Sequence, residues 1–233
     1  MLGVLVNVIG IVFGGLMGTV FKKNVSEKIS TAILSAIGLC VTYIGITGVL
    51  EGKNTLVEIV SMVIGTAIGT AIDIDDKINR LGRFVEDKLN KGEHRVSLAE
   101  GFVSASLLFC IGSMAVVGSL NAGIMHDYEM LYTKSLLDLV SSVMMASSLG
   151  IGVALSGVSI LIVEGSITLL AGFLGGILTD SAVTEMTCVG SLLIVAIGLN
   201  LTGISKFKVA NFMPAIIFAP LLLWLYDLVP FLP

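Results

Sequence analysis

The chain has 233 residues, of which 55% are hydrophobic and 13% are charged; its mean hydropathy is +1.03 and its formal net charge is −4. In soluble proteins about a quarter of the residues are charged, so this composition excludes a soluble globular protein. Apolar runs long enough to cross about 30 Å of hydrocarbon as helices recur along the whole chain. The sequence therefore predicts an all-α, polytopic transmembrane helical bundle that forms one domain over residues 1–233.

Eight transmembrane spans are predicted, separated mostly by short loops. Their ranges are 2–21, 30–50, 55–73, 101–120, 135–157, 160–179, 186–204 and 209–228. The first span is apolar from Leu2 and follows no basic region, so we expect it to be retained and not cleaved as a signal peptide. Residues 156–161 carry no charge that would mark a loop. If they belong to one broken element, the count falls to seven spans, and this alternative stays open.

Basic residues gather in the segments that follow the first, third and seventh spans. These segments hold eleven of the thirteen lysines and arginines. Cytoplasmic loops are enriched in these residues, so we expect the N-terminus on the outer side of the membrane. The polar connector 74–99 fits an amphipathic helix on the cytoplasmic leaflet and, equally, an ordinary solvated helix.

Glycine-punctuated apolar segments occur near both ends of the chain. Thr47-Gly48 closes the first and Thr202-Gly203 closes the second. The loop charges give residues 2–73 and 160–228 opposite orientations, which indicates an inverted-topology repeat; chance alignment of glycines is the alternative. Glycines four apart on one helical face let two backbones approach closely. The candidates for such packing are Gly10, Gly14, Gly18, Gly65, Gly69, Gly172 and Gly176.

Polar residues inside the apolar runs are the candidates for a solute or ion path. They are Asn7, Thr47, Asn121, Asp138, Ser142 and Asn200. Charged side chains within a membrane are costly, so they pair with one another or line an aqueous path. Lys134 lies four residues before Asp138 on one helical face. Two readings therefore stay open, in which Lys134 neutralises Asp138 structurally or Asp138 lines the path.

The sequence contains no pattern that supports catalysis. It has no zinc-protease motif, P-loop or nucleophile elbow, and His94 and His126 fall in loops on opposite sides of the predicted bundle. Cys40, Cys110 and Cys188 lack ligand spacing and are interpreted as packing residues. We therefore expect no enzyme, no catalytic residue, no metal site and no cofactor, and no nucleic acid as a partner.

Three stretches closely resemble the YdfK/YqgA-like family of bacterial inner-membrane proteins (domain of unknown function 554). They are residues 101–120 (GFVSASLLFCIGSMAVVGSL), 131–138 (LYTKSLLD) and 146–153 (ASSLGIGV). The N-terminal Asn7-x-x-Gly10 also fits. In the family a Gln-Asp-Gly often follows the Gly-Ser pair, whereas this chain has Asn121-Ala122-Gly123 and lacks that carboxylate. The resemblance implies the fold class and a multi-pass location in the bacterial inner membrane; it implies no activity.

These observations favour a secondary transporter that moves a small solute or ion through a polar path between inverted repeats. An ion channel is one alternative. The other is a non-transporting scaffold or sensor that forms homo-oligomers through Gly10, Gly14 and Gly18. The expected partners are the lipid bilayer and a small solute or ion, with a second copy of the chain in the scaffold alternative.

Overall fold

The computed structural model describes the chain except for residues 23–26, 81–97, 112, 175–177 and 229–233. Every regular element in these described parts is a helix, which confirms the predicted fold class. The elements are α1 (Leu2–Lys22), α2 (Glu27–Val49), α3 (Thr55–Ile72), α5 (Leu98–Cys110), α6 (Ser113–Ile124), α7 (Glu129–Leu149), α8 (Gly152–Leu169), α9 (Ala171–Leu174), α10 (Asp180–Leu201), the 3-10 helix η1 (Val209–Phe212) and α11 (Pro214–Leu228). Helices dominate because hydrocarbon supplies no hydrogen-bond partner, so each backbone group must be satisfied within its own segment.

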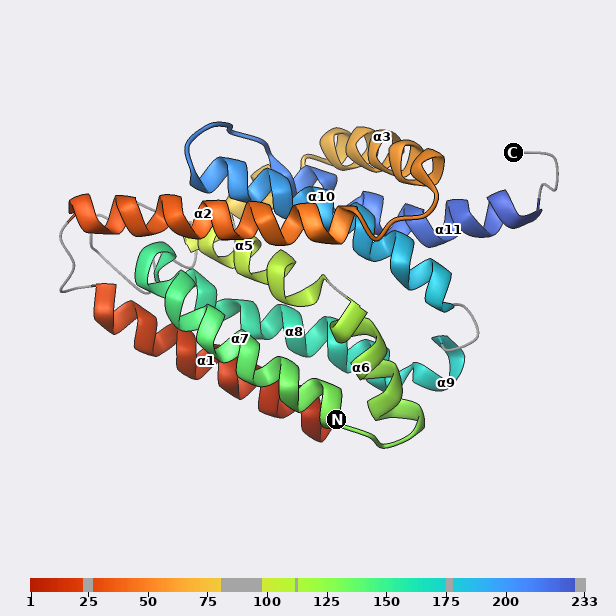
Figure 1. The fold of residues 1–233 in the computed structure, drawn as a ribbon, viewed down its shortest axis with the longest axis horizontal. Helices are drawn as coiled ribbons and strands as arrows, with labels where there is room; N and C mark the ends of the chain where they lie inside the picture. The colour runs from red at the N-terminus through yellow and green to blue at the C-terminus, as the bar shows by residue number, and fades with distance from the viewer. Residues whose placement is uncertain (23–26, 81–97, 112, 175–177, 229–233) are drawn as a thin grey trace.

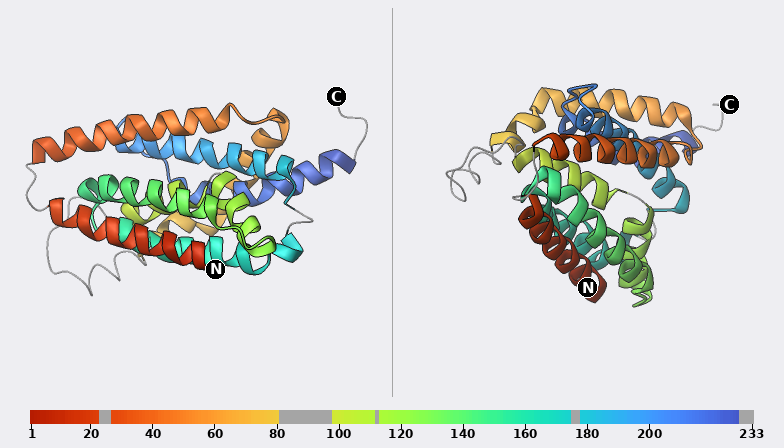
Figure 2. Two further views of the ribbon diagram at one scale, coloured as in Figure 1. Left: turned by 60° about the horizontal axis from the view of Figure 1, so that its bottom comes forward. Right: turned by 60° about the vertical axis from the view of Figure 1, so that its left-hand side comes forward.

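The helices form two groups that lie against each other (Figure 1). The lower group contains α1, α5, α6, α7 and α8, and the upper group contains α2, α3, α10 and α11. The two further views keep this division (Figure 2). The largest buried apolar cluster crosses it, with Ile11 and Phe109 from the lower group packed with Val41 and Leu193 from the upper. The core therefore joins the two groups, and the site described below lies inside the lower one.

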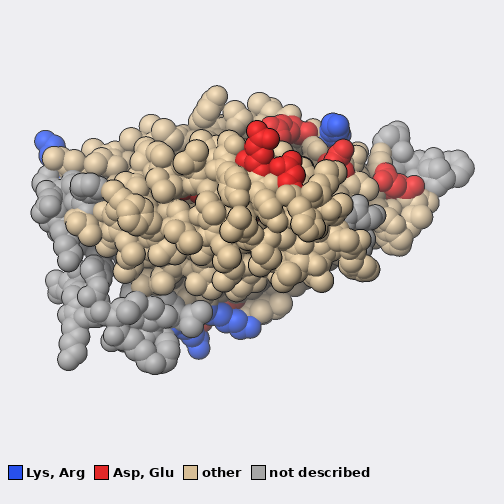
Figure 3. All heavy atoms as spheres, turned by 90° about the horizontal axis from the view of Figure 1, so that it is seen from below, with Lys and Arg blue, Asp and Glu red and all other residues tan. Residues whose placement is uncertain are grey.

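Six helical segments in the described part of the chain are long and apolar enough to cross a membrane. The bent pair α5–α6 makes a seventh when it is counted as one span. Helix α7 has 21 residues but carries Glu129, Lys134 and Asp138, and it falls outside these six. Large exposed side chains on the helices are mostly apolar, including Ile9, Leu39 and Ile217. Figure 3 shows one face largely covered by uncharged residues.

The predicted spans 101–120, 135–157 and 160–179 differ most from the helices of the structure. The loop expected near residues 156–161 lies instead at Gly150, whose φ of 80° suits glycine because it lacks a Cβ. Helix α8 runs unbroken through Ser156 and Gly157, which are both buried. The predicted span 101–120 is also not one straight helix, because α5 ends at Cys110 and the axes of α5 and α6 differ by 60°.

Glycines permit close contact between helices of the same chain. A Cβ added to Gly14 would lie 2.1 Å from Ser142 Oγ of α7, and one added to Gly18 would lie 2.3 Å from the Val143 carbonyl oxygen. Gly10 faces the same helix, so all three glycines are buried within the chain and are not available to a second copy, contrary to the scaffold alternative. On the other side of the molecule, Gly65 and Gly69 face the start of α11 and η1.

The remaining predictions about local structure have different outcomes. No heavy atom lies within 4 Å of a Cβ added to Gly172, so this glycine makes no close helix contact. Gly176 lies outside the described residues. Most of the connector 74–99 lies outside them too; within it, residues 74–80 are helical and residues 98–99 begin α5.

Pro214 begins α11, a position that a helix tolerates because the first turn has unpaired N–H groups. Pro220 lies inside that helix.

Candidate functional site

Four polar side chains from three helices meet inside the lower group. They are Asn7 of α1, Lys134 and Asp138 of α7, and Glu164 of α8. None is more than 8% exposed, and Asn7 and Glu164 are completely buried. We call these four residues the lysine cluster. Residues far apart in the sequence thus form one polar centre within apolar helices.

Lys134 holds the two carboxylates of the lysine cluster together. Its Nζ donates to Asp138 Oδ2 and lies 3.3 Å from Glu164 Oε1. With all three groups ionised, one positive charge faces two negative charges and the cluster carries a net charge of −1. Charges removed from water are stable only when they are paired and hydrogen-bonded, so the remaining negative charge makes the cluster a favourable place for an added cation.

Asn7 supplies the amide that bridges the two carboxylates. Its Nδ2 donates to Asp138 Oδ2 at 3.1 Å and to the Glu164 oxygens at 3.2 and 3.3 Å. The two carboxylates determine which way the Asn7 amide group is turned. If the group were flipped, its oxygen would lie against the negatively charged carboxylate oxygens. The Asn7 Oδ1 is buried, and no described residue forms a hydrogen bond with it. The lysine cluster therefore contains one acceptor that a bound polar group would satisfy.

Helix α5 runs alongside α8 toward the lysine cluster. Leu98 lies against Gly152 and Ser106 donates to Ser159, so α5 points toward Glu164 before it ends at Cys110. Both α5 and α6 pack against α7 and α8, which carry the charges of the cluster. The ends of an interrupted helix leave backbone groups without helical partners, and transporters use such ends to bind ions and solutes.

Three of the six predicted path residues lie at the contact between α1 and α7. Asn7 and Asp138 belong to the lysine cluster, and Ser142 lies one turn further along α7 against Gly14. The Ser142 hydroxyl donates to the Leu139 carbonyl of its own helix.

The other three predicted path residues lie elsewhere. Thr47 is exposed on α2 and donates to the Ile44 carbonyl. Asn121 is near the end of α6 and is partly buried. Asn200 anchors the loop after α10, where its Oδ1 accepts from Ser205 Oγ at 2.7 Å and from the Phe207 amide at 2.8 Å.

Glu164 was not among the six predicted path residues, and the predicted span 160–179 would place it near the start of a helix. Moving the loop to Gly150 puts Glu164 in the later half of α8, next to Asp138, and not near the helix start. Its signal in the sequence was a glutamate surrounded by apolar residues inside a predicted span, since such residues are rare unless they are functional or paired.

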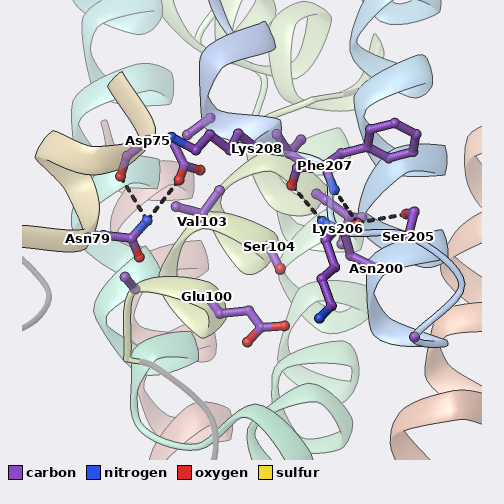
Figure 4. A pocket seen from close by; sticks show the side chains of 15 residues that line it. Asp75, Asn79, Glu100, Val103, Ser104, Asn200, Ser205, Lys206, Phe207 and Lys208 are labelled. Carbon is purple, nitrogen blue, oxygen red and sulfur yellow. Dashed lines mark hydrogen bonds between the residues drawn. The ribbon is translucent and has the colours of Figure 1, made fainter. Parts of the chain in front are cut away.

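A pocket of about 420 Å³ opens at the end of the molecule where α10 is followed by η1 (Figure 4). Asp75, Glu100, Ser104 and Lys206 line it, together with Asn200. Figure 4 shows the Lys206 and Glu100 side chains reaching into the same space. The pocket therefore offers charges of both signs to a polar ligand.

The wall of this pocket is fixed by side-chain hydrogen bonds. Asn79 donates to Asp75 Oδ2 at 2.9 Å, and the buried Asn211 accepts from the Asp75 amide at 2.8 Å. Partial burial raises the pKa of Asp75 above its ordinary value, and the neighbouring Asp73 and Asp76 add to this, whereas Lys208 opposes it. Lys208 also lies 3.5 Å from Asp73, so a basic residue of the loop after α10 contacts the end of α3.

Comparison with known proteins identifies the family. A family model described as "Protein of unknown function (DUF554)" matches residues 2–224. The chain belongs to this family. It is 32% identical over 228 residues to the uncharacterized membrane protein YdfK of Bacillus subtilis (strain 168), covering 96% of both chains. It is 28% identical over 222 residues to YqgA of Escherichia coli (strain K12), covering 94% of both.

No solved structure matches the chain. The family and the apolar helices together show that the chain is a multi-pass helical membrane protein.

Proposed function

We propose that the protein is a secondary transporter of a small solute or ion, and that the lysine cluster is its binding centre. The observation that carries the proposal is the meeting of Asn7, Lys134, Asp138 and Glu164 beside an interrupted helix. Buried charges are costly in a membrane, so an arrangement with two carboxylates and one cation is expected to serve binding more than stability. We propose transport and not catalysis as its purpose.

Helix α5 connects the pocket with the lysine cluster. Its first half contributes Val103 and Ser104 to the pocket, and it runs alongside α8 toward Glu164 before it ends at Cys110. Cys110 lies six positions after Ser104, which corresponds to about 9 Å along the axis. Ser106, between them, donates to Ser159 of α8 at 2.9 Å. The proposal therefore includes a route along α5 from the pocket to the cluster.

The packing of the helices supports the inverted repeat. The repeat makes α1 equivalent to α8, α2 to α10 and α3 to α11, and the two members of each of these pairs contact one another. A two-fold axis in the membrane plane would bring equivalent helices together in this way. On α2, Gly38 faces Gly198 of α10, and Gly45 faces Ser191, the residue after Gly190. The repeat makes Gly38 equivalent to Gly190 and Gly45 equivalent to Gly198. The contact of Gly38 with Gly198 and that of Gly45 near Gly190 are therefore related by the repeat.

The distribution of charge supports a location in the bacterial inner membrane with the N-terminus outside. Lys28, Lys77, Lys206 and Lys208 are exposed at the end of the bundle that carries the pocket. The N-terminus lies toward the other end (Figure 1). Because basic residues favour the cytoplasmic side, the pocket would open to the cytoplasm and the loop between α2 and α3 to the outside.

Transport can be tested with purified protein in liposomes fused to a solid-supported membrane. The probes are a panel of amino acids, organic acids, sugars and alkali-metal salts, applied as concentration jumps. We expect a saturable current for at least one probe, reduced at least tenfold by Asp138→Asn. Ser147→Ala is the matched control on the same helix, because its hydroxyl is exposed and bonds only the Met144 carbonyl. A current that grows without saturation would indicate a channel, and silence for every probe would favour a scaffold.

A further inference from the structure

A second pair of buried carboxylates lies where α3 and α10 meet the loop between α2 and α3. Glu58 belongs to the first turn of α3, and Glu185 lies near the start of α10. Glu58 is 8% exposed and Glu185 only 1%. They lie at the end of the molecule opposite the pocket of Figure 4, and none of their neighbours belongs to the lysine cluster. We call Glu58 and Glu185 the glutamate pair.

One oxygen of Glu185 is fully satisfied and the other is free. Its Oε1 accepts from the backbone amides of Lys53 and Asn54, both at 3.1 Å, and from Asn54 Nδ2 at 3.2 Å. Its Oε2 is buried and has no hydrogen-bond partner among the described residues. Three donors on Oε1 hold the carboxylate in one orientation, so the position of Oε2 is fixed as well.

Gly52, in the same loop, lies against the second carboxylate. A Cβ added to Gly52 would lie 2.0 Å from Glu58 Oε1 and 2.6 Å from Cys188 Sγ. Cys188 follows Glu185 by three residues on α10 and therefore lies on the same helical face. Its thiol donates to the Val49 carbonyl at 3.3 Å. The loop residues Gly52 to Asn54 thus contact Glu58 and Glu185 together, with no room for a larger side chain at Gly52.

The glutamate pair has no counter-charge of its own. In the part of the chain that the structure describes, no lysine, arginine or histidine forms an ion pair with Glu58 or Glu185. Lys53 belongs to the neighbouring loop and is exposed, as are the acidic Glu51 and Asp180 at this end of the bundle. Two carboxylates buried together without a cation are unfavourable, and a bound cation removes that cost.

We propose that Glu58 and Glu185 bind a hard, oxygen-liganded metal cation such as sodium, calcium or magnesium. Carboxylate and backbone carbonyl oxygens are the ligands these ions prefer. Among the described residues there is no group of three or more His, Cys, Asp or Glu able to hold a metal. The two carboxylates would hold the ion together with backbone oxygens or water, a ligand set that suits hard cations and not zinc. Binding of this ion requires no transport activity. An experiment that disproved transport would therefore leave the proposed ion site untouched.

The experiment measures thermal unfolding of the purified protein in detergent at constant pH and ionic strength, held with choline chloride. Sodium, calcium and magnesium chlorides are then substituted in separate titrations. We expect at least one of them to raise the unfolding midpoint in a saturable way, and Glu185→Gln to weaken its apparent affinity at least tenfold. Asp180→Asn, which removes an exposed carboxylate from the first turn of the same helix, should leave the affinity unchanged.

A second variant and a direct binding measurement complete the test of the proposal. Glu58→Gln provides a second variant if Glu185→Gln fails to fold, and equilibrium binding of radioactive sodium or calcium reports the ion directly. The proposal is overturned if no cation stabilises the wild-type protein, or if the saturable shift persists in both glutamine variants. Stabilisation that follows pH alone, with no effect of any metal ion, would show that the pair takes up protons only and would also overturn it.

Discussion

The lysine cluster and the glutamate pair each bury two carboxylates, but they compensate them differently. In the lysine cluster a side-chain cation, Lys134, lies against both acids and Asn7 bridges them. In the glutamate pair, the compensation seen among the described residues is three N–H donors on one oxygen of Glu185. The lysine cluster thus has one cation for its two acids, whereas no cation among the described residues is paired with the glutamate pair. Removing a charged group should therefore lower the stability of the protein at the lysine cluster, but should maintain or raise it at the glutamate pair.

The largest effect is expected where the lysine cluster depends on helix contact. Gly14→Leu would insert a side chain 2.1 Å from Ser142 Oγ and 2.6 Å from the Leu139 carbonyl oxygen, forcing α1 away from α7. We expect no folded protein, because adding single methylenes to a tight contact commonly costs about 1–3 kcal/mol and a leucine side chain adds far more bulk than that. Thermal unfolding in detergent shows whether the variant is folded. Gly172→Ala is the control, since nothing lies within 4 Å of its Cβ, and an equal loss there would contradict this account.

Removing the cation should be nearly as damaging. Lys134→Met leaves Asp138 and Glu164 buried without a positive charge, and breaking such a pair costs about 3–5 kcal/mol. The double variant Lys134→Met with Glu164→Gln should recover part of this loss, because one of the two carboxylates is then neutral. Denaturation of the wild type, the two single variants and the double variant in the same detergent checks the prediction. Additive losses would show that Lys134 does not compensate Glu164.

Loss of the bridging amide should have an intermediate effect. Asn7→Leu removes the donor shared by Asp138 and Glu164, and leaving buried acceptors unsatisfied costs about 1–3 kcal/mol. It should also weaken binding of any transported ion in the flux assay. If Asn7→Leu were as stable as the wild type and transported normally, the amide would have no part in the cluster.

The glutamate pair should respond in the opposite direction. In buffer without metal cations, Glu185→Gln removes a buried charge while its amide oxygen can still accept from Lys53, Asn54 or both. We expect unfolding free energy to stay the same or to rise by up to about 1 kcal/mol, since neutralising an unpaired buried charge removes a desolvation cost. A marked loss of stability in the metal-free buffer would mean that the chain itself compensates Glu185.

The smallest effect is expected for the partly exposed carboxylate that faces the pocket. Burial raises the pKa of Asp75, so the folded state binds a proton more tightly than the unfolded state. Its contribution to stability is therefore fully present below the ordinary pKa of aspartate and is lost as the pH rises through the raised value. Asp75→Asn should abolish this slope, measured by unfolding at a series of pH values. An unchanged slope would assign it to other groups.

Particular residues show how much of the site was predictable. Asn7, Lys134 and Asp138 stand out in the sequence because polar residues within apolar runs are expensive. Glu164 was equally visible, but the uncharged stretch around residue 156 hid the real loop at Gly150 and placed it at the wrong depth. Thr47 and Asn200 were both predicted to line the path, but Thr47 is exposed and Asn200 anchors a loop. The glutamate pair was not foreseen, because no spacing relates Glu58 to Glu185.

The sequence by itself determined that this is a helical membrane protein, where most of its helices lie and which polar residues they carry. These properties follow from composition and local hydrogen bonding, because an apolar segment in lipid must satisfy its own backbone. Only the tertiary structure decided that α1, α7 and α8 bring Asn7, Lys134, Asp138 and Glu164 together beside a broken helix. That choice depends on which helix faces meet at Gly10, Gly14 and Gly18, and the packing of side chains across helices has no local signature in the sequence.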